Sequence, residues 1–489
     1  MIQSRTHNCN ELRLSDAGKN VTIVGWYENI RKVSKNLGFL ILRDFYGTTQ
    51  VVIETEEMMQ VIDSVNKEST ISVTGVVRER SSKNKDLATG EIEVVPEKIE
   101  ILGKCIYNAL PFEINQSKDA DENTRLKYRY LDLRNPAVKG NIVLRSKIVA
   151  ELRQKMNSLN FMEITTPILT CSSPEGARDY LVPARNHPGK FYALPQAPQQ
   201  FKQILMASGF DRYFQIAPCF RDEDARADRS PGEFYQLDME MAFASQEDVF
   251  SVVEEVLPPV FEKYGVYKTA SKAPFVRIPY LESMDKYGSD KPDLRIDLVL
   301  QDATEVMADC GFGPFEGQTV KAIVVDGFTA TRKVIDGICA EVEVQTANKA
   351  FWFKLDENGE LVGGIAKFLQ DRKEAVIAAL GLKPGDFVGL TAGKKLAAQK
   401  TAGVLRKLLG AASDKHMKKD CYEFCWIVDF PMYEIGEESG ELEFCHNPFS
   451  MPQGGLEALN TMDPLDILAY QYDIVCNGVE LSSGAVRNH

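Results

Sequence analysis

The chain has 489 residues, of which 44% are hydrophobic and 26% are charged, and its formal net charge is −13 at pH 7. This composition is typical of a soluble globular protein with several domains and excludes a disordered, collagen-like or disulfide-dense chain. No uncharged apolar stretch approaches the ~20 residues that cross a bilayer, and the first residues lack a secretory signal, so no membrane partner is expected. The ten cysteines are scattered without a CxxC pair, which indicates free thiols in a reducing cytoplasm.

The acidic balance argues against indiscriminate binding of nucleic acid, so DNA is not an expected partner. Residues 1–140 are close to neutral, however. Any contact with nucleic acid therefore requires local basic patches, and the N-terminal part of the chain is the better candidate.

The first hundred residues contain five short runs rich in β-branched and aromatic residues, separated by turn residues. The runs are residues 21–27, 39–42, 49–53, 70–77 and 92–95. Five such strands predict a small closed barrel such as the OB-fold, which binds oligonucleotides on its open face. A generic β-sandwich is the alternative.

The middle and the end of the chain alternate between polar, helical and strand patterns. Residues 108–135 indicate a polar linker with a short Arg-rich helix at 125–134, and the spacing of apolar residues predicts a helix over 137–159. Strands are expected at 211–221 and 235–244. Residues 291–425 indicate an inserted α+β module, and the chain is strand-rich again from Trp426.

Two strands flank a highly charged loop at residues 222–233. Side chains alternate between the faces of a strand, so Gln215, Ala217, Cys219 and Arg221 share one face of the incoming strand. Gln236, Asp238 and Glu240 share one face of the outgoing strand. Such a polar face predicts a platform for a charged ligand, although a merely solvated face is the alternative.

A second hairpin turns at Asn477-Gly478, a strong two-residue turn signal. Closing it there pairs Cys476 with Val479, Val475 with Glu480, and Asp473 with Ser482. Asp473 and Glu480 become diagonal neighbours about 7–8 Å apart, and converging carboxylates repel unless a cation lies between them. Mg²⁺ bound through these carboxylates and substrate phosphates fits this arrangement, and two separately solvated carboxylates are the alternative.

Several motifs together resemble the bacterial-type aspartyl-tRNA synthetases, which are class II aminoacyl-tRNA synthetases. The motifs lie at residues 174–180, 199–202, 219–224, 288–295, 446–449 and 480–487. The resemblance covers essentially the whole chain. It implies a multi-domain protein with an N-terminal OB-fold β-barrel that binds the anticodon, an α+β class II core on an antiparallel sheet, and an inserted α+β module of the GAD type.

The implied domains are an OB-fold at residues 1–106, a linker at 107–140, the catalytic core at 141–290 and 426–489, and the inserted module at 291–425. The segment 160–167 looks like the first class II signature, which lies at the dimer interface in that family. A homodimer is therefore expected.

The implied function is that of an aspartate–tRNA ligase, which activates L-aspartate with ATP to aspartyl-adenylate and transfers it to the 3′ end of tRNA(Asp). Neither step needs a covalent protein nucleophile, so catalysis depends on alignment and charge stabilisation. By resemblance, Arg221 holds the α-phosphate and Glu223 contacts the nucleotide, and both are the candidate catalytic residues. The candidate ATP-binding residues are Arg221, Asp222, Glu223, Ser230, Gln236 and Glu480, and Asp473 and Glu480 hold Mg²⁺.

By resemblance, Lys202 and Arg487 bind the side-chain carboxylate of aspartate. Gln199 and Glu175 position the amino acid together with Arg221, and His446 closes over it. A desolvated lysine that faces neutral asparagine lacks its charge partner, at a cost of several kcal/mol. Lys202 therefore favours aspartate over the related asparaginyl-tRNA synthetases.

Contacts with tRNA are expected on the barrel. Arg31 and Lys35 belong to one basic loop, and residues 78–85 form another. Phe39 corresponds to an aromatic residue on which an anticodon base stacks, and Gln50 would read a base edge. The alternative for Phe39 is a place in the core of the barrel.

The third class II signature, whose arginine holds the γ-phosphate of ATP, is expected downstream of Arg487, but the chain ends at His489. This predicts a truncated chain that activates aspartate poorly or not at all. A noncatalytic tRNA-binding or regulatory paralogue and an asparaginyl-tRNA synthetase are the alternative functions. Whether tRNA(Asn) is also charged does not follow from the residues.

Overall fold

The computed structural model describes residues 4–173, 177–223, 232–436 and 439–488. The chain divides into two compact units, Met1–Arg145 and Ser146–His489, and the division falls inside the helix α4 (Pro136–Ser158). The domain boundaries predicted from the sequence stay a prediction.

The first unit contains a closed barrel in which the strands follow the order β1-β2-β3-β5-β4. Its strands are β1 (Asn20–Lys32), β2 (Gly38–Arg43), β3 (Thr48–Ile53), β4 (Thr70–Glu79) and β5 (Ile92–Gly103). Alternate residues such as Ile23, Leu40 and Val73 fill the interior, and α1 (Glu56–Asp63) adds Met59 and Ile62. The predicted OB-type barrel is confirmed, and the β-sandwich alternative is wrong.

The predicted Arg-rich helix at 125–134 is interrupted. The structure has α2 (Glu122–Lys127) and α3 (Arg129–Asp132), and Tyr128 between them has the non-helical angles φ −109° and ψ 41°. Asp132 is fully buried, accepts a hydrogen bond from Ser117 at 2.7 Å and forms ion pairs with Arg125 and Arg129. These contacts are a physical reason for the break, because they direct the arginines toward one buried carboxylate.

The core of the second unit has two sheets, in the orders β10-β9-β6 and β11-β17-β22-β23. Their strands are β6 (Met162–Glu163), β9 (Arg212–Phe220), β10 (Glu233–Met241), β11 (Val276–Pro279), β17 (Phe424–Val428), β22 (Gln471–Cys476) and β23 (Val479–Ala485). The expected antiparallel pairing dominates, although β6–β9 and β11–β17 are parallel.

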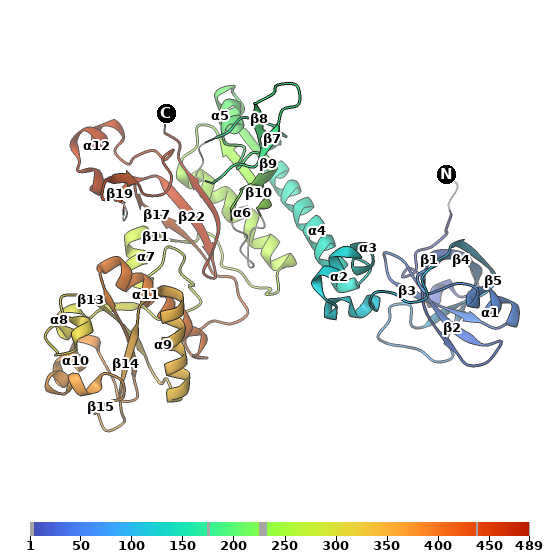
Figure 1. Cartoon of the computed structure of the whole chain (residues 1–489), viewed down its shortest axis with the longest axis horizontal. Helices are drawn as coiled ribbons and strands as arrows, with labels where there is room; N and C mark the ends of the chain where they lie inside the picture. Colours follow the sequence, from blue (N-terminus) through green and yellow to red (C-terminus); the bar gives the residue numbers. More distant parts are fainter. Residues whose placement is uncertain (1–3, 174–176, 224–231, 437–438, 489) are drawn as a thin grey trace. The chain divides into compact units, whose positions relative to one another are not determined.

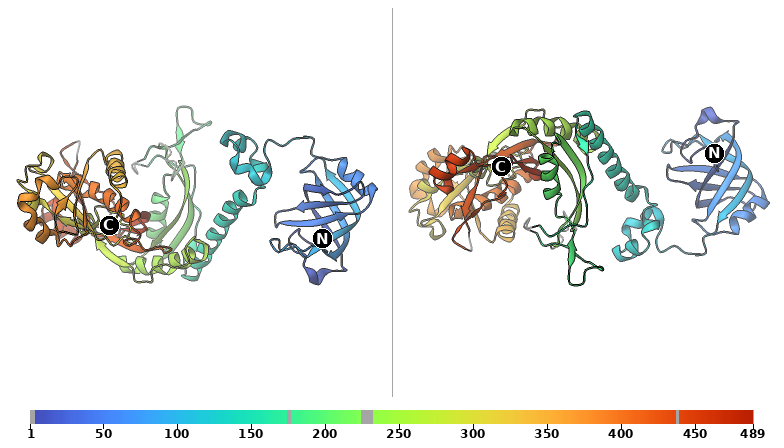
Figure 2. Two further views of the ribbon diagram at one scale, coloured as in Figure 1. Left: turned by 90° about the horizontal axis from the view of Figure 1, so that it is seen from below. Right: turned by 90° about the horizontal axis from the view of Figure 1, so that it is seen from above.

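One helix, α6 (Gln246–Tyr264), packs against an apolar face of each core sheet. Its Val252 and Val256 lie against Leu237 and Met239 of β10, and its Phe250 stacks on Trp426 at 4.0 Å between ring centroids. Figure 2 shows this helix running beside the strands. The helix covers the apolar faces, so the polar side chains of β10 lie on the opposite face.

The predicted inserted module is a five-stranded sheet with helices on both faces (Figure 1). Its strands, in the order β12-β13-β16-β14-β15, are β12 (Leu300–Asp302), β13 (Thr319–Val325), β14 (Ala350–Leu355), β15 (Leu361–Val362) and β16 (Phe387–Gly393). α8 (Thr304–Met307) and α10 (Lys373–Leu380) cover one face, and α9 (Arg332–Thr346) and α11 (Lys395–Ala411) cover the other.

The remaining elements of the second unit are short. They are β7 (Leu181–Pro183), β8 (Phe191–Ala193), α5 (Gln199–Ala207), α7 (Tyr280–Tyr287), β18 (Phe430–Pro431), β19 (Tyr433–Ile435), β20 (Leu442–Phe444), α12 (Gly455–Thr461) and β21 (Leu468–Ala469). Among all helices in the described ranges, none combines the length and apolarity that a membrane crossing requires.

Candidate active site

The β9–β10 hairpin presents the polar face that the alternation of its residues predicts. Gln215 lies opposite Asp238, and Ala217 lies opposite Gln236. Lys202, the fourth residue of α5, reaches this face with a side chain that is only 8% exposed. Its Nζ lies 2.6 Å from Asp238 Oδ1 and 2.9 Å from Glu240 Oε1.

Arg487 contacts the same cluster from the end of the chain. Its Nη2 lies 3.3 Å from Glu240 Oε1 and 3.5 Å from Gln199 Oε1. Burial alone would lower the pKa of the Lys202 ammonium, but the charges of Asp238 and Glu240 outweigh burial and raise it. Lys202 is therefore a fixed cation, and Glu240 is shared by both cations.

Asp238 and Glu240 were predicted only as members of a polar face. Their role as anionic partners of Lys202 was missed, because α5 and β10 are brought together by tertiary structure. The signal available in the sequence was Lys202, which the resemblance implies to be desolvated, together with two carboxylates on one strand face.

Arg221 directly follows β9, and its backbone N–H donates to Gly232 O at 2.8 Å. Its guanidinium lies 5.1 Å from the centre of the Phe234 ring. Its Nε is buried and has no hydrogen-bond partner among the described residues. Such a donor fits an anionic ligand at this end of the hairpin.

The neighbouring candidates have defined places where the structure describes them. The backbone N–H of Asp222 donates to Arg178 O at 2.9 Å, and Arg178 Nε donates to Asp222 O at 2.9 Å. Glu223 is exposed. Gln236 Oε1 accepts a hydrogen bond from Cys219 Sγ at 3.3 Å. Glu175 and Ser230 lie outside the described residues.

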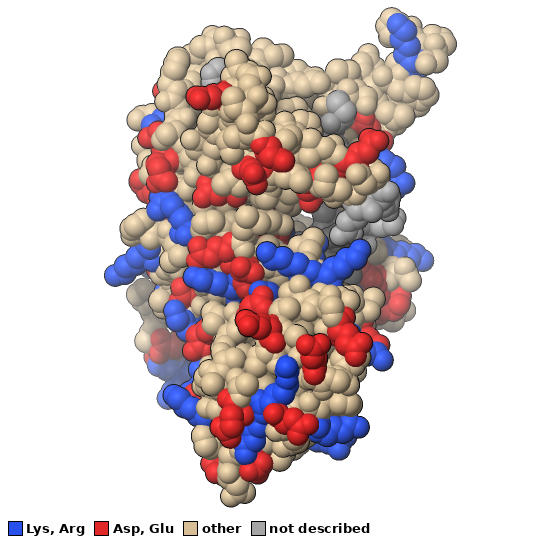
Figure 3. Space-filling view, turned by 90° about the vertical axis from the view of Figure 1, so that its left-hand side faces the viewer, with Lys and Arg blue, Asp and Glu red and all other residues tan. Residues whose placement is uncertain are grey.

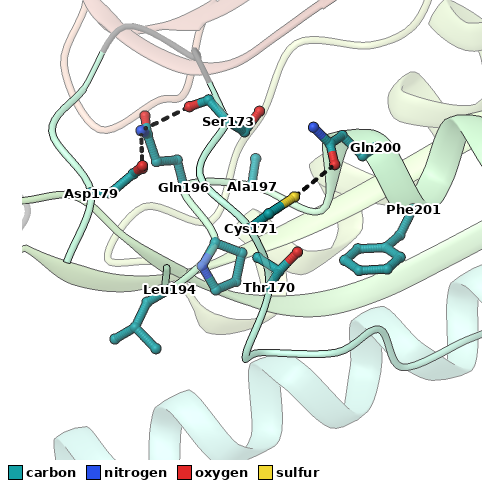
Figure 4. Close-up of a pocket in the computed structure, with 10 residues that line it drawn as sticks. Thr170, Cys171, Ser173, Asp179, Leu194, Gln196, Ala197, Gln200 and Phe201 are labelled. Carbon is teal, nitrogen blue, oxygen red and sulfur yellow. Dashed lines mark hydrogen bonds between the residues drawn. The ribbon is translucent and has the colours of Figure 1, made fainter. Parts of the chain in front are cut away.

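Gln196 lies beside the candidate site and was not predicted from the sequence. Its side chain is buried and clamps the motif segment that precedes α5: Nε2 donates to Asp179 Oδ1 at 2.6 Å and to Ala177 O at 2.8 Å, and Oε1 accepts from Ala177 N at 3.1 Å. Figure 4 shows Gln196 pointing at Asp179 and Ser173, beside the contact between Cys171 and Gln200. This clamp holds residues 177–179 close to the start of α5.

The β22–β23 hairpin confirms two of the three predicted pairs, Cys476–Val479 and Val475–Glu480. The third pair is wrong: Asp473 lies opposite Ser483, and Ser482 lies opposite Ile474. β23 carries one extra residue between these pairs, and such a bulge shifts the register of everything beyond it.

The two carboxylates nevertheless influence each other. Asp473 is 5% exposed, and its Oδ1 has no hydrogen-bond partner in the described parts of the chain. Burial is the largest cause, and the charge of Glu480 the second, of the shift that raises the pKa of Asp473 to about 7. Lys291 Nζ lies 3.2 Å from Glu480 Oε2, so a lysine supplies positive charge beside this pair.

The orphaned oxygen of Asp473 and the nearby Glu480 fit a Mg²⁺ ion, which binds through one or two carboxylates and completes its shell with water and phosphate. The described residues contain no group of three or more His, Cys, Asp or Glu that could hold a metal by itself. Substrate phosphates would therefore have to supply part of the coordination.

His446 lies among aromatic rings at 5.7 Å from Tyr280 and 5.1 Å from Phe430 between centroids. Burial lowers the pKa of its imidazole below the usual value. At neutral pH the ring is therefore uncharged, and it is suited to hydrogen bonding rather than to charge pairing.

On the barrel, Arg31 pairs with Phe39 across β1 and β2, and Ile41 pairs with Gln50 across β2 and β3. The Arg31 guanidinium lies 4.9 Å from the Phe39 ring, which is half-buried and lies on the outer face, so it is not part of the barrel core. Lys35 is exposed in the turn between β1 and β2.

Gln50 forms a hydrogen bond with Glu93, a residue that was not predicted to belong to this site. Its Nε2 donates to Glu93 Oε2 at 2.9 Å, and Glu93 also accepts from Arg78 at 2.7 Å. The outer face of the barrel thus combines an aromatic ring, an amide and arginines.

The comparisons with known proteins agree with this architecture. A model of the class II tRNA synthetases (D, K and N) matches residues 121–489, and a model of the OB-fold nucleic acid binding domain matches residues 21–102. The chain is 52% identical over 494 residues to the aspartate–tRNA ligase of Streptomyces avermitilis, covering 100% of this chain and 83% of that one. It is 51% identical over 504 residues to the aspartate–tRNA(Asp/Asn) ligase of Rickettsia felis, with the same coverage of 100% and 83%.

A solved structure, the aspartyl tRNA synthetase from Entamoeba histolytica, superposes with a TM-score of 0.53 at 18% identity and covers 97% of this chain and 77% of that one. It supports the fold. The chain therefore belongs to the class II tRNA synthetases. Within that class it belongs to the family of aspartate–tRNA ligases, at about half identity over its whole length.

The expected fold and family are thus confirmed, and the relatives are ligases, so the expectation of poor or absent activity is not borne out. The position of the third class II signature stays a prediction. The chain spans 83% of the length of the two relatives.

Proposed function

We propose that the polar face of the β9–β10 hairpin, with α5 and Arg487, is the substrate site of an aspartate–tRNA ligase that activates L-aspartate with ATP and transfers it to the 3′ end of tRNA(Asp). The observation that carries this proposal is the cluster in which Lys202 and Arg487 both contact Glu240. Two cations on one side of a hairpin suit a ligand with a second carboxylate.

The cluster also explains the choice of amino acid. Aspartate and asparagine have nearly the same shape, so a site that rejects asparagine must read charge. Arg487 and the buried Lys202 read the side-chain carboxylate, and Gln199 and Glu175 position the backbone of the amino acid. His446, uncharged at neutral pH, closes over it.

Arg221 binds the α-phosphate of ATP and stabilises the charge that develops when the aspartate α-carboxylate attacks it. The support is its buried Nε, which has no hydrogen-bond partner among the residues described. Electrostatic stabilisation by preorganised donors is commonly the largest part of such catalysis. Asp222, Glu223, Ser230 and Gln236 complete the nucleotide contacts.

Asp473 and Glu480 would hold Mg²⁺, which when bound neutralises phosphate charge. The protein's own contribution is to place the buried carboxylate of Asp473 on β22 near the half-exposed carboxylate of Glu480 on β23. Asp473 is 5% exposed, and its raised pKa reflects that burial and the charge of Glu480.

The outer face of the barrel binds the anticodon. Phe39 stacks on a base, Gln50 reads a base edge while Glu93 fixes its amide, and Arg31 and Lys35 contact the backbone. We further propose a homodimer, and a cytoplasmic location that agrees with ten free cysteines.

Isothermal titration of the full chain with L-aspartate and L-asparagine tests the proposal. Aspartate should bind at least about 30-fold more tightly, because the neutral amide of asparagine cannot replace the charged contact that a carboxylate makes with Lys202 and Arg487. Equal affinities would refute the assignment of Lys202 and Arg487.

A further inference from the structure

A cavity of about 420 Å³ lies between the core and the inserted module. The loop of residues 288–293 after α7, the helix α11, His446 and the hairpin turn at Gly478 line it. The volume is within the ordinary range of small-molecule sites. Apart from His446, no residue of this lining has a role proposed above, although the loop belongs to a motif, residues 288–295, that the sequence singles out.

The lining is locally basic in a chain whose net charge is −13. Lys291, Lys400, Arg406 and Lys407 line the cavity, against the carboxylates of Asp290 and Asp293. Both carboxylates already have cations: Asp290 pairs with Lys291, and Asp293 pairs with Arg295 at 2.7 Å. On the face shown in Figure 3, charges of both signs are interspersed.

Arg406 adds a buried charge without an ionic partner. It is 2% exposed, and its guanidinium donates to backbone carbonyls, to Leu298 O and Ile296 O at 2.6 Å and to Asp293 O at 3.1 Å. No salt bridge joins Arg406 to any described carboxylate, and burial lowers its pKa to about 10. The guanidinium also lies 4.8 Å from the centre of the Tyr287 ring, so neutral groups hold Arg406 and its positive charge beside the cavity is not cancelled by an ion pair.

One residue, Lys291, connects the cavity lining to the candidate phosphate site. Lys291 lines the cavity, and its Nζ lies 3.2 Å from Glu480 Oε2. A phosphate-containing anion that moves from the candidate phosphate site at Asp473 and Glu480 into the cavity therefore contacts Lys291 first. It then contacts Lys400 and Lys407 on α11.

The wall that holds these lysines is fixed by close backbone contact. A Cβ on Gly288, which has φ +66°, would lie 2.2 Å from Gln399 O, and a Cβ on Gly403 would lie 2.2 Å from Gly288 O. The end of α7 and the middle of α11 can approach this closely only with glycines. The cations of α11 are thereby held at a set position beside the loop.

We propose that this cavity binds the pyrophosphate that leaves during activation. The aspartate α-carboxylate oxygen forms a bond to the α-phosphorus of ATP, the bond between that phosphorus and the bridging oxygen breaks, and the bridging oxygen departs with the β- and γ-phosphates. Lys291 turns from Glu480 to the departing anion, and Lys400 and Lys407 bind it in the cavity. This inference rests on the proposed placement of ATP at Arg221 and Glu480.

Equilibrium titration of the full chain with sodium pyrophosphate, with and without Mg²⁺, tests the proposal without turnover. The variant Lys400→Ala/Lys407→Ala should bind pyrophosphate about tenfold more weakly, as expected for two partly exposed ionic contacts. Both lysines are exposed, so the fold should tolerate the change. The matched control, Lys333→Ala/Lys349→Ala, removes two exposed lysines of the same module that do not line the cavity, and it should stay within about twofold.

Further arms separate the sources of phosphate. The same variant should leave the affinity for L-aspartate unchanged, and should weaken ATP and a CCA-ending RNA by less than twofold. Unchanged pyrophosphate affinity, or equal weakening of the control, would overturn the proposal, and so would a larger effect on ATP or RNA than on pyrophosphate. Failure of the proposed aspartate site would appear separately, as equal binding of aspartate and asparagine by the unaltered chain.

Discussion

Replacing Lys202 by methionine tests whether the cluster at Glu240 recognises substrate or only stabilises the fold. The change keeps an unbranched side chain and removes the ammonium, which lies 2.6 Å from Asp238 and 2.9 Å from Glu240. Removing one partner of a buried ion pair costs about 3–5 kcal/mol, because the other charge stays buried. We expect Lys202→Met to lower the free energy of unfolding by this amount.

The double variant Lys202→Met/Asp238→Asn separates the two roles. Asp238 Oδ2 has no hydrogen-bond partner among the described residues, so this carboxylate depends on Lys202. Neutralising it together with the lysine should restore most of the stability, since a buried pair can often be replaced as a whole. The double variant should still lack the cation that reads the aspartate side chain.

The measurements are urea-induced unfolding and ATP–pyrophosphate exchange with aspartate. Exchange, as kcat/KM for aspartate, should fall at least about 30-fold in both variants, the loss expected for a truncated buried charge pair. Lys190→Met, at an exposed lysine of the same unit, is the control and should match the unaltered chain. Normal aspartate exchange by the stable double variant would refute the role of Lys202 in recognition.

Three further predictions concern other parts of the chain. Phe39→Ala should weaken tRNA(Asp) binding by about 1–3 kcal/mol, the value of one stacked base, with no change in the affinity for aspartate, whereas Phe45→Ala in the β2–β3 turn should bind normally. Glu254→Ala leaves the buried N–H groups of Trp426 and Phe275 without their shared acceptor, so the free energy of unfolding in urea should fall by about 1–3 kcal/mol. The control Glu255→Ala, at an exposed position, should lower the free energy of unfolding by less than about 0.5 kcal/mol. Burial opposes ionisation of Asp132, but hydrogen bonds from Ser117 and Arg125 outweigh burial and lower the pKa of Asp132 below 3.8. The ionised carboxylate therefore stabilises the fold above pH 3.8, and this stabilisation is lost as the pH falls through the lowered pKa. The stability difference between the unaltered chain and Asp132→Asn should therefore shrink on acidification below pH 3.8, and a constant difference would contradict the assignment.

The barrel could be predicted from the sequence because one face of each strand is buried. Residues such as Ile23 and Leu40 alternate with half-exposed ones, and this period of two fixes both strand type and register. The β9–β10 hairpin was predictable for the same reason, and its polar face is as expected. Local pattern is sufficient where local burial decides the structure.

Long-range features were not predictable. The register at Asp473 is wrong in the sequence prediction because a bulge near Leu481 has no turn signal of its own. The break at Tyr128 depends on a buried carboxylate that collects arginines. The partners of Lys202 and the clamp at Gln196 join elements that are distant along the chain, so no spacing rule reveals them.

The two cations of the cluster should respond differently to substrate. The cluster is formally neutral, because it contains two cations, Lys202 and Arg487, and two carboxylates, Asp238 and Glu240. A carboxylate that enters the site must therefore take a hydrogen-bond donor away from Glu240, because no cation of the cluster is unpaired. Lys202 has contacts of 2.6 and 2.9 Å and a side chain 8% exposed, whereas Arg487 has contacts of 3.3 and 3.5 Å and is 27% exposed.

Arg487 is therefore the cation that can turn to the ligand, while Lys202 keeps its contacts with Asp238 and Glu240 and reads the ligand carboxylate from a fixed position. It follows that Arg487→Gln should weaken aspartate binding at least about 30-fold, by the loss of a charged partner, yet lower the free energy of unfolding by no more than about 1 kcal/mol, as for a partly exposed pair. Titration calorimetry and urea unfolding measure the two effects. If Arg487→Gln destabilises the fold as much as Lys202→Met does, the two cations are equivalent and this division of roles is wrong.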